Sequence, residues 1–195
     1  MIQIRLLQPG DRQGLIDLIE PVDKNIVGMY SETKELVDDW INTIEEGMWE
    51  VFVVIISQKA YKIEQKRIIR KLFPWKRLKD NPSGIIGLVT LYADWQEDDD
   101  LEQGEFDIGI TVAEAFKRKG IGKELLLNII KRGELLGYNK ATLWTRIDNY
   151  PMIKLAENFG FKKGRTRTRH GHKWDQYYQE IDIIKKERKK DPTIL

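Results

Sequence analysis

The stretch from Ile108 to Leu127 limits what this chain can fold into more than any other part of the sequence. It starts with alternating apolar residues, which predict a strand, and continues through a turn of basic residues and glycines. An amphipathic helix follows and is expected to begin near Lys123. The first amide groups of a helix lack carbonyl partners and carry partial positive charge. The turn is therefore a natural site for an anion.

Glycines and basic side chains in this turn favour a diphosphate over a carboxylate. Gly120 and Gly122 let the backbone come close to the ligand, and three consecutive basic residues before them add attraction at long range. One glycine pair is weak evidence, because many strand-to-helix turns carry glycines for steric reasons. A second motif is therefore needed to identify the ligand.

Two motifs together resemble the signature of the GNAT acetyltransferase superfamily. The first, VAEAFKRKGIGKELL, is similar to the family's strand, glycine turn and helix, with Lys117 where the family usually has Arg or Gln. The second, ATLWTRIDNYPMIKLAENFGFKKG, is similar to the family's next strand, Asn, helix and closing Gly-Phe. They occur in the family's order, and the resemblance extends from about residue 2 to about residue 183.

The resemblance implies one α/β domain over residues 1–183, followed by a charged tail at 184–195. Its sheet is expected to be mixed, mostly antiparallel and twisted, with helices flanking it. The implied reaction transfers acetyl from acetyl-coenzyme A to a primary amine of a protein or peptide N-terminus, a polyamine or another small amine. A length of 195 residues with 41% hydrophobic residues suits a single core.

The resemblance also implies which residues hold acetyl-coenzyme A. In similar enzymes, main-chain groups of the cofactor strand bind the acetyl carbonyl and the pantetheine, which points here to Ile110, Thr111 and Val112. Asn149 is the counterpart of an Asn that hydrogen-bonds the pantetheine. The diphosphate is expected on main-chain amides of the turn. The residues of that turn are Lys117, Arg118, Lys119, Gly120, Ile121, Gly122 and Lys123.

Acetyl transfer to an amine requires a group that accepts the amine proton, because an alkylammonium with a pKa of about 10.4 is mostly protonated at neutral pH. Asp107 and Glu105 are the candidates, since both lie at the start of the cofactor strand. Asp107 is the closer match to an acid-x-Gly motif found in one branch of the family. A purely structural role for Asp107 at the sheet edge is an equal alternative.

The leaving thiolate needs a proton, and here the chain departs from the family. The usual Tyr of the Leu-Tyr-x-x-x-Gly-Phe pattern is replaced by Ala156, which cannot donate one. Three alternatives stay open: another hydroxyl such as Tyr150 or Tyr138, a water molecule, or a protein that binds the cofactor with little turnover. The last defines a rival function, a non-catalytic acyl-coenzyme A-binding module.

A basic insert at residues 57–83 separates two predicted strands at 49–56 and 84–92, and it carries nine Lys or Arg residues against two acidic ones. One interpretation is an insertion that covers one edge of the domain or forms an oligomer contact, such as a homodimer contact, with its charges solvated. The charges also suit docking on RNA or a ribosome, or contact with anionic lipid. The rival function would use this insert for docking on RNA, a ribosome or a protein partner.

An acidic loop follows the second of these strands, with eight Asp or Glu residues and no Lys or Arg between Asp94 and Asp107. Most of these charges are expected to be solvated. The loop also suits attraction of a cationic amine, or pairing with the basic insert. Further strands are expected at 2–7, 141–147 and 174–181.

Composition excludes several other chemistries. The chain has no cysteine and two histidines, so disulfides, a thiolate nucleophile and a cysteine-based zinc site are excluded and no metal is expected. A Ser-His-Asp triad is poorly supplied. The N-terminus lacks a signal-peptide pattern, and no run approaches the roughly 18 apolar residues of a spanning helix. We therefore expect a cytoplasmic protein.

Overall fold

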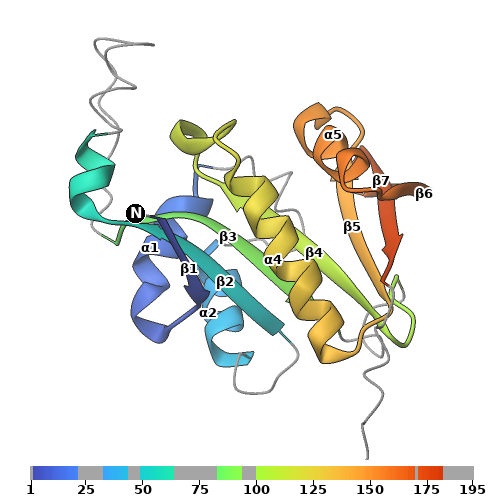
Figure 1. Cartoon of the computed structure of the whole chain (residues 1–195), viewed down its shortest axis with the longest axis horizontal. Helices are drawn as coiled ribbons and strands as arrows, with labels where there is room; N and C mark the ends of the chain where they lie inside the picture. The colour runs from blue at the N-terminus through green and yellow to red at the C-terminus, as the bar shows by residue number, and fades with distance from the viewer. Residues whose placement is uncertain are drawn as a thin grey trace, which may run out of the picture.

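A seven-stranded sheet runs through the protein, with its strands in the order β1-β2-β3-β4-β5-β7-β6 (Figure 1). Neighbouring strands are antiparallel, except for the parallel pair β4 and β5. The computed structural model describes residues 2–21, 33–43, 49–63, 83–93, 100–169 and 171–181. The strands are β1 (Ile2–Leu6), β2 (Trp49–Ile56), β3 (Ile85–Tyr92), β4 (Glu105–Val112), β5 (Lys140–Arg146), β6 (Lys162–Arg169) and β7 (His172–Glu180).

Helices cover the two faces of the sheet unequally. The cluster under α1 and α2 takes its strand residues from β2 and β3, including Val53 and Leu88. The cluster under α4 and α5 is wider and takes strand residues from β2, β3, β4, β5 and β7, including Phe106 and Leu143. The helices are α1 (Arg12–Ile19), α2 (Thr33–Thr43), α4 (Ile121–Leu136) and α5 (Tyr150–Asn158), with 3-10 turns η1 (Pro9–Asp11) and η2 (Glu114–Phe116).

The predicted fold class is confirmed, since the chain forms one mostly antiparallel sheet flanked by helices. Some boundaries differ from expectation. The cofactor strand begins at Glu105, before its apolar part, and the helix after the glycine turn begins at Ile121. Strand β4 extends further back because Glu105 takes part in the pairing with β5, which apolar alternation could not reveal.

The basic insert lies mostly outside the described residues. Residues 58–63 form a short helix directly after β2, and residues 64–82 are not described. The assignment of residues 1–183 to one domain and 184–195 to a tail stays a prediction. Within the described ranges, no helix is long and apolar enough to cross a membrane.

Candidate functional site

Strands β4 and β5 pair at one end and separate at the other. Beyond the last pair, β4 continues beside β3 as far as Val112, and β5 continues beside β7 as far as Arg146. The divergence is visible in Figure 1. The three pairs that we call the closed end are Glu105 with Lys140, Phe106 with Ala141, and Asp107 with Thr142. Residues 108–112 of β4, which we call the open end, have no partner strand on the β5 side among the residues that the structure describes, so their main-chain groups there are available to a ligand.

The loop that follows β4 presents amide groups at the start of α4. Glu124 donates the first helical hydrogen bond, to the carbonyl of Gly120 over 3.1 Å. The amides of Ile121, Gly122 and Lys123 precede that bond and have no partner within the helix. Gly120 has a φ of 84°, and a Cβ built there would meet no atom within 4 Å. The loop thus offers an open cradle of N–H groups, as an anion requires.

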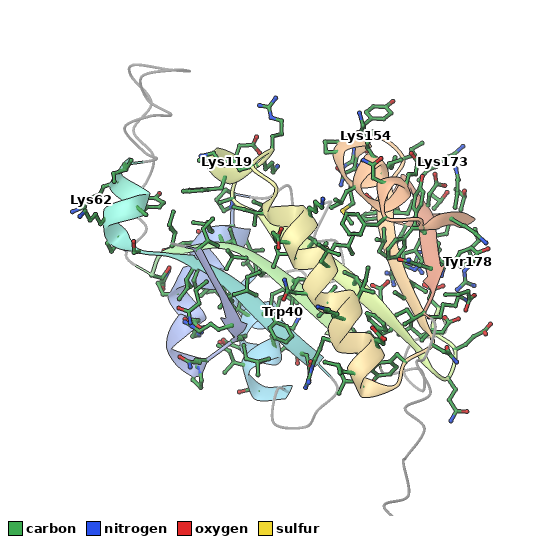
Figure 2. All side chains as sticks on the ribbon, in the orientation of Figure 1. Trp40, Lys62, Lys119, Lys154, Lys173 and Tyr178 are labelled. Carbon is green, nitrogen blue, oxygen red and sulfur yellow. The ribbon has the colours of Figure 1, made fainter. Side chains whose placement is uncertain are left out.

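Two basic side chains of this loop contact the 3-10 turn η2 that precedes it. Lys117 forms an ion pair with Glu114 at 2.6 Å, and the Nζ of Lys119 lies 5.0 Å from the ring centroid of Phe116. Figure 2 shows Lys119 near the start of α4 and Lys154 on α5 at the same end of the molecule. The main chain, more than these side chains, therefore defines the anion cradle.

Helix α5 packs beside the start of α4. A Cβ added to Gly122 would lie 3.4 Å from the Leu155 side chain, so the first turn of α4 lies next to the middle of α5. Asn149 is the N-cap of α5, and its side chain makes no capping hydrogen bond. Tyr150 is the first residue of the helix and is 73% exposed. Asn149 thus keeps its side-chain amide available at the open end.

Neither Ala156 nor Tyr138 offers a proton donor at the open end. Ala156 is fully buried in the core cluster beneath α5. Tyr138 follows the C-terminal end of α4 and packs on Phe106, with 5.4 Å between ring centroids. The 16 residues of α4 span about 24 Å, so Tyr138 lies far from the glycine loop.

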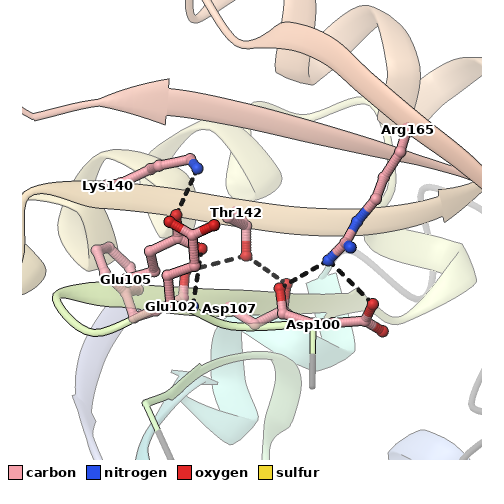
Figure 3. A network of polar contacts seen from close by, with 8 residues as sticks. Asp100, Glu102, Glu105, Asp107, Lys140, Thr142 and Arg165 are labelled. Atoms are coloured by element: carbon pink, nitrogen blue, oxygen red, sulfur yellow. Dashed lines mark hydrogen bonds and ion pairs between the residues drawn. The ribbon is translucent and has the colours of Figure 1, made fainter. Parts of the chain in front are cut away.

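The closed end contains a buried ion pair. Glu105 is buried, and its carboxylate pairs with Lys140 and accepts a hydrogen bond from the Glu102 amide at 3.2 Å (Figure 3). Burial alone would lower the pKa of Lys140, but the hydrogen bond to Glu105, with the charges of Glu102 and Glu180, raises it. Glu105 therefore has a partner already.

Asp107 lies where the two strands begin to separate. Its carboxylate accepts a hydrogen bond of 3.0 Å from the hydroxyl of Thr142, which is fully buried. Asp107 itself is half-buried. Two residues further along β4, the amide of Gly109 donates to the hydroxyl of Thr90 at 3.1 Å. Of the two predicted carboxylates, Asp107 is thus the one next to the open end.

A polar pocket of about 290 Å³ adjoins the closed end. Sequence reasoning missed most of it, because its walls come from four separate segments. The alternation of polar residues along β5 was the available signal, since Lys140 and Thr142 share one face of that strand. The lining residues are Asp100, Glu102, Glu105, Lys140, Arg165 and Gln176.

The described part of the acidic loop pairs with β6. Asp100 forms ion pairs with Arg165 at 3.0 Å and with Arg167. The guanidinium of Arg167 lies 3.8 Å from the ring centroid of Trp144 on β5. The predicted pairing of this loop with the basic insert falls on residues 64–82 and 94–99, which lie outside the described residues.

The open end fits a coenzyme A thioester. Main-chain groups of β4 without a strand partner suit an extended arm carrying amides, and the open cradle at Gly120 suits a diphosphate. Ile110, Thr111 and Val112 belong to that part of β4, and residues 117–123 form the cradle. The residues named from the sequence for the cofactor are therefore brought to one end of the sheet.

Solved structures share this fold. An N-acetyltransferase from Staphylococcus aureus Mu50 has a TM-score of 0.66 and 16% identity, with 92% of this chain and 98% of that chain covered. A spermidine/spermine N-acetyltransferase from Vibrio cholerae has a TM-score of 0.62 and 18% identity, with 92% of each chain covered. An acetyltransferase from Salmonella typhimurium with its cofactor acetyl-CoA has a TM-score of 0.64 and 14% identity, with 93% and 94% covered.

Sequence comparison identifies the family. A search of curated proteins gives no match. The sequence model of the acetyltransferase (GNAT) family matches residues 39–161, which is more than half of the chain and includes both motifs up to Phe161. Acetyl-CoA is the cosubstrate of this family. The chain therefore belongs to the GNAT family of acetyltransferases.

Proposed function

We propose that this protein transfers the acetyl group of acetyl-CoA to a primary amine by direct attack within a ternary complex. The separation of β4 from β5 above the glycine loop of α4 is the observation that carries the proposal. The separation leaves main-chain groups of β4 without a strand partner on the β5 side within the described ranges. The first amides of α4 have no partner within the helix. An N-acetyltransferase needs both, one for the acyl arm and one for the diphosphate.

The cofactor-binding residues are assigned on the same basis. Ile110, Thr111 and Val112 hold the acyl arm through their main chain, and the residues from Lys117 to Lys123 hold the diphosphate through their amides. Asn149 adds its side-chain amide. When bound, acetyl-CoA supplies the acetyl group as a thioester. The chain positions that group for attack by the amine.

Asp107 accepts the proton of the acceptor amine, directly or through water. Its place beside the open end supports this role, and the hydroxyl of Thr142 keeps its carboxylate oriented. Glu105 is the weaker candidate because Lys140 already pairs with it in a buried position. As the amine nitrogen bonds to the carbonyl carbon, the thiolate leaves and the amine proton passes to Asp107.

The thiolate takes its proton from solvent water or from Tyr150. Tyr150 is well exposed beside Asn149, so its hydroxyl has access to solvent, whereas Ala156 can donate nothing. Because water can replace an exposed hydroxyl, a Tyr150→Phe variant should lose less than about tenfold in kcat, below the roughly 10²- to 10⁴-fold contribution of a required general acid. A loss above 100-fold would make Tyr150 the required proton donor.

Thiol release from acetyl-CoA in the presence of an amine panel tests the proposed reaction. The panel should include a peptide with a free N-terminus, spermidine, a diamine and an amino acid with a side-chain amine. Turnover with at least one amine, and loss of that turnover in Asp107→Asn, is the expected result. Turnover that survives this substitution would remove Asp107 from the mechanism.

A non-catalytic acyl-CoA-binding module is the second candidate. The alanine at position 156 favours it, because this side chain carries no proton donor for the leaving thiolate. Acetyl-CoA binding without turnover of any amine would support this candidate. Docking through the basic insert would then appear as salt-sensitive RNA or ribosome binding that is lost when residues 57–83 are deleted.

A further inference from the structure

The polar pocket beside the closed end contains both signs of charge. Its carboxylates come from Asp100, Glu102 and Glu105, its cations from Lys140 and Arg165. The Gln176 amide, from a residue only 8% exposed, completes the lining. A ligand with only positive charge would face two cations there, and a ligand with only negative charge would face three carboxylates. A group carrying both charges meets a partner for each.

The two cations keep hydrogen-bond donors beyond their present pairs. The Nη2 group of Arg165 donates to the carbonyl oxygen of Asp100, and its second contact is with the Asp100 carboxylate. A guanidinium has five N–H donors, so Nη1 and Nε remain for a ligand. The ammonium of Lys140 has three donors, and Glu105 uses one. A ligand carboxylate can therefore bind without breaking either ion pair.

The pocket is small and lies within reach of Asp107. At about 30 Å³ per water in the liquid, 290 Å³ corresponds to roughly ten water molecules, which suits a head group of amino-acid size. Gln176 on β7 lies opposite Trp144 on β5 in the strand register, so the pocket lies over β5 and β7. Asp107 belongs to the adjacent strand β4. Strands are about 4.8 Å apart, which places Asp107 on the order of one to two strand spacings, about 5–10 Å, away. A flexible four-carbon chain ending in an amine covers that distance.

We propose that the acceptor is a zwitterionic α-amino acid whose side chain carries the reacting primary amine, with its head group held in this pocket. The carboxylate of the acceptor binds Arg165 and Lys140, and its α-ammonium binds Glu102 and Asp100. The side-chain amine then extends past Asp107 to the open end. Its nitrogen bonds to the acetyl carbon, the thiolate leaves, and the amine proton goes to Asp107. This proposal rests on the proposed acetyltransferase function and specifies its acceptor.

Matched acceptors that differ by one charge test the head-group contacts. L-lysine carries both head-group charges, 6-aminohexanoate lacks the α-ammonium, lysinamide and cadaverine lack the carboxylate, and n-butylamine lacks both. The kcat/KM for L-lysine should exceed that for any singly depleted amine by about 10- to 100-fold, and that for n-butylamine by more, since each lost group leaves a charged partner unpaired. Mass spectrometry should find the acetyl group on the side-chain nitrogen. Equal kcat/KM across the series, or acetylation at the α-nitrogen, would overturn the proposal.

A substitution on β6 tests whether the pocket causes the preference for L-lysine. Arg165→Gln should reduce the ratio of kcat/KM for L-lysine over cadaverine by about tenfold or more. Arg169→Gln removes the same charge from the same strand outside the pocket lining and should leave the ratio at its wild-type value. Arg165 has a well-exposed side chain, so its loss should not prevent folding. An unchanged ratio in Arg165→Gln would contradict the assignment.

Binding of an unreactive head group separates this proposal from the acetyltransferase function. L-norleucine has the amino-acid head group and no side-chain amine, and n-pentylamine lacks the carboxylate. NMR titration with L-norleucine should shift the Gln176 side-chain amide, and n-pentylamine should shift it far less. If no amine is acetylated but L-norleucine binds here, the reaction is wrong and the pocket assignment stands. If amines are acetylated but L-norleucine does not bind, the pocket assignment is wrong and the reaction stands.

Discussion

The two ends of β4 differ in what holds them. At the closed end, β4 pairs with β5 over residues 105–107, and Asp107 also pairs with Tyr92 of β3. The Glu105–Lys140 ion pair and the Thr142–Asp107 hydrogen bond also join β4 to β5 there. At the open end, β4 pairs with β3 alone, and its residues are apolar, small or glycine. One strand is thus a structural joint over its first residues, and in the proposed function it is a binding edge over its last.

The comparison explains why main-chain groups can bind a cosubstrate here. An unpaired N–H or C=O in a strand normally pairs with a neighbour, and leaving it unpaired away from water is costly. The ion pair and hydrogen bond at the closed end fix where pairing stops, at Asp107 and Thr142. Side chains at one end of the strand therefore determine the availability of the backbone at the other.

Asp107, at the boundary between the two ends, should show the largest effect. Asp107→Asn keeps an oxygen to accept the Thr142 hydrogen bond but cannot accept the amine proton. The expected loss in kcat is about 10²- to 10⁴-fold, the usual contribution of a general base. Steady-state thiol release measures it, with acetyl-CoA binding measured in parallel to show that the open end is intact. A loss in kcat below about threefold would mean that Asp107 has only a structural role at the closed end.

Gly120→Val should come next, by altering the cradle beyond the open end. The new side chain would occupy the space above the helix amides and force a β-branched residue into a left-handed conformation. We expect KM for acetyl-CoA to rise about 10- to 100-fold, which is the loss of one or two charge-assisted hydrogen bonds. Gly137→Val is the matched control, because Gly137 is also left-handed and open but closes the far end of α4. Equal rises in KM in both variants would mean that the substitutions act by destabilising α4.

Glu105→Gln should act on stability at the closed end. Removing the charge leaves the Lys140 ammonium partly buried without its partner, which costs about 1–3 kcal/mol in the free energy of unfolding. Asp148→Asn is the control, because the Asp148 carboxylate of the Arg146–Asp148 pair is exposed to solvent and its neutralisation should cost less free energy of unfolding than Glu105→Gln. Denaturant unfolding measures both. If the two variants lost the same amount, the closed end would not depend on its buried ion pair.

The smallest effect should be the alkaline pH dependence of the closed end. The folded-state pKa of Lys140 lies above its unfolded value, so the ion pair contributes fully below the unfolded pKa of about 10.4. That contribution is lost as the pH rises from there through the folded pKa. Unfolding free energies measured across this range should fall more in the wild type than in Glu105→Gln. If the unfolding free energy fell equally with pH in both proteins, the Glu105–Lys140 ion pair would not be the cause of the pH dependence.

The sequence predicted the open end of β4 better than the closed end. The apolar alternation up to Val112 and the glycines at 120 and 122 depend on local geometry, which neighbouring residues encode directly. The same is true of Asn149, which precedes a helix that begins at Tyr150 with Pro151. Family resemblance linked these two segments, and the fold brings them together.

Partners distant in sequence explain what the sequence could not predict. Glu105 was a candidate base from its position, but its pairing with Lys140 spans 35 residues and depends on strand register. The contact of Asp100 with Arg165 spans 65 residues and has no local pattern at either position. The sheet order β5-β7-β6, which creates the polar pocket, is likewise set by tertiary packing. The proposed acceptor pocket therefore could be found only from the structure.

Amide chemical shifts during an acetyl-CoA titration test the central claim most directly. The claim is that the open end of β4 and the start of α4 form the cosubstrate site, while the closed end is a structural joint. NMR should show the largest shifts at Ile110, Val112 and the residues from Gly120 to Lys123, with Phe106 and Ala141 nearly unchanged. Saturable shifts concentrated at the closed end or under α1 and α2, with none at the glycine loop, would contradict the account.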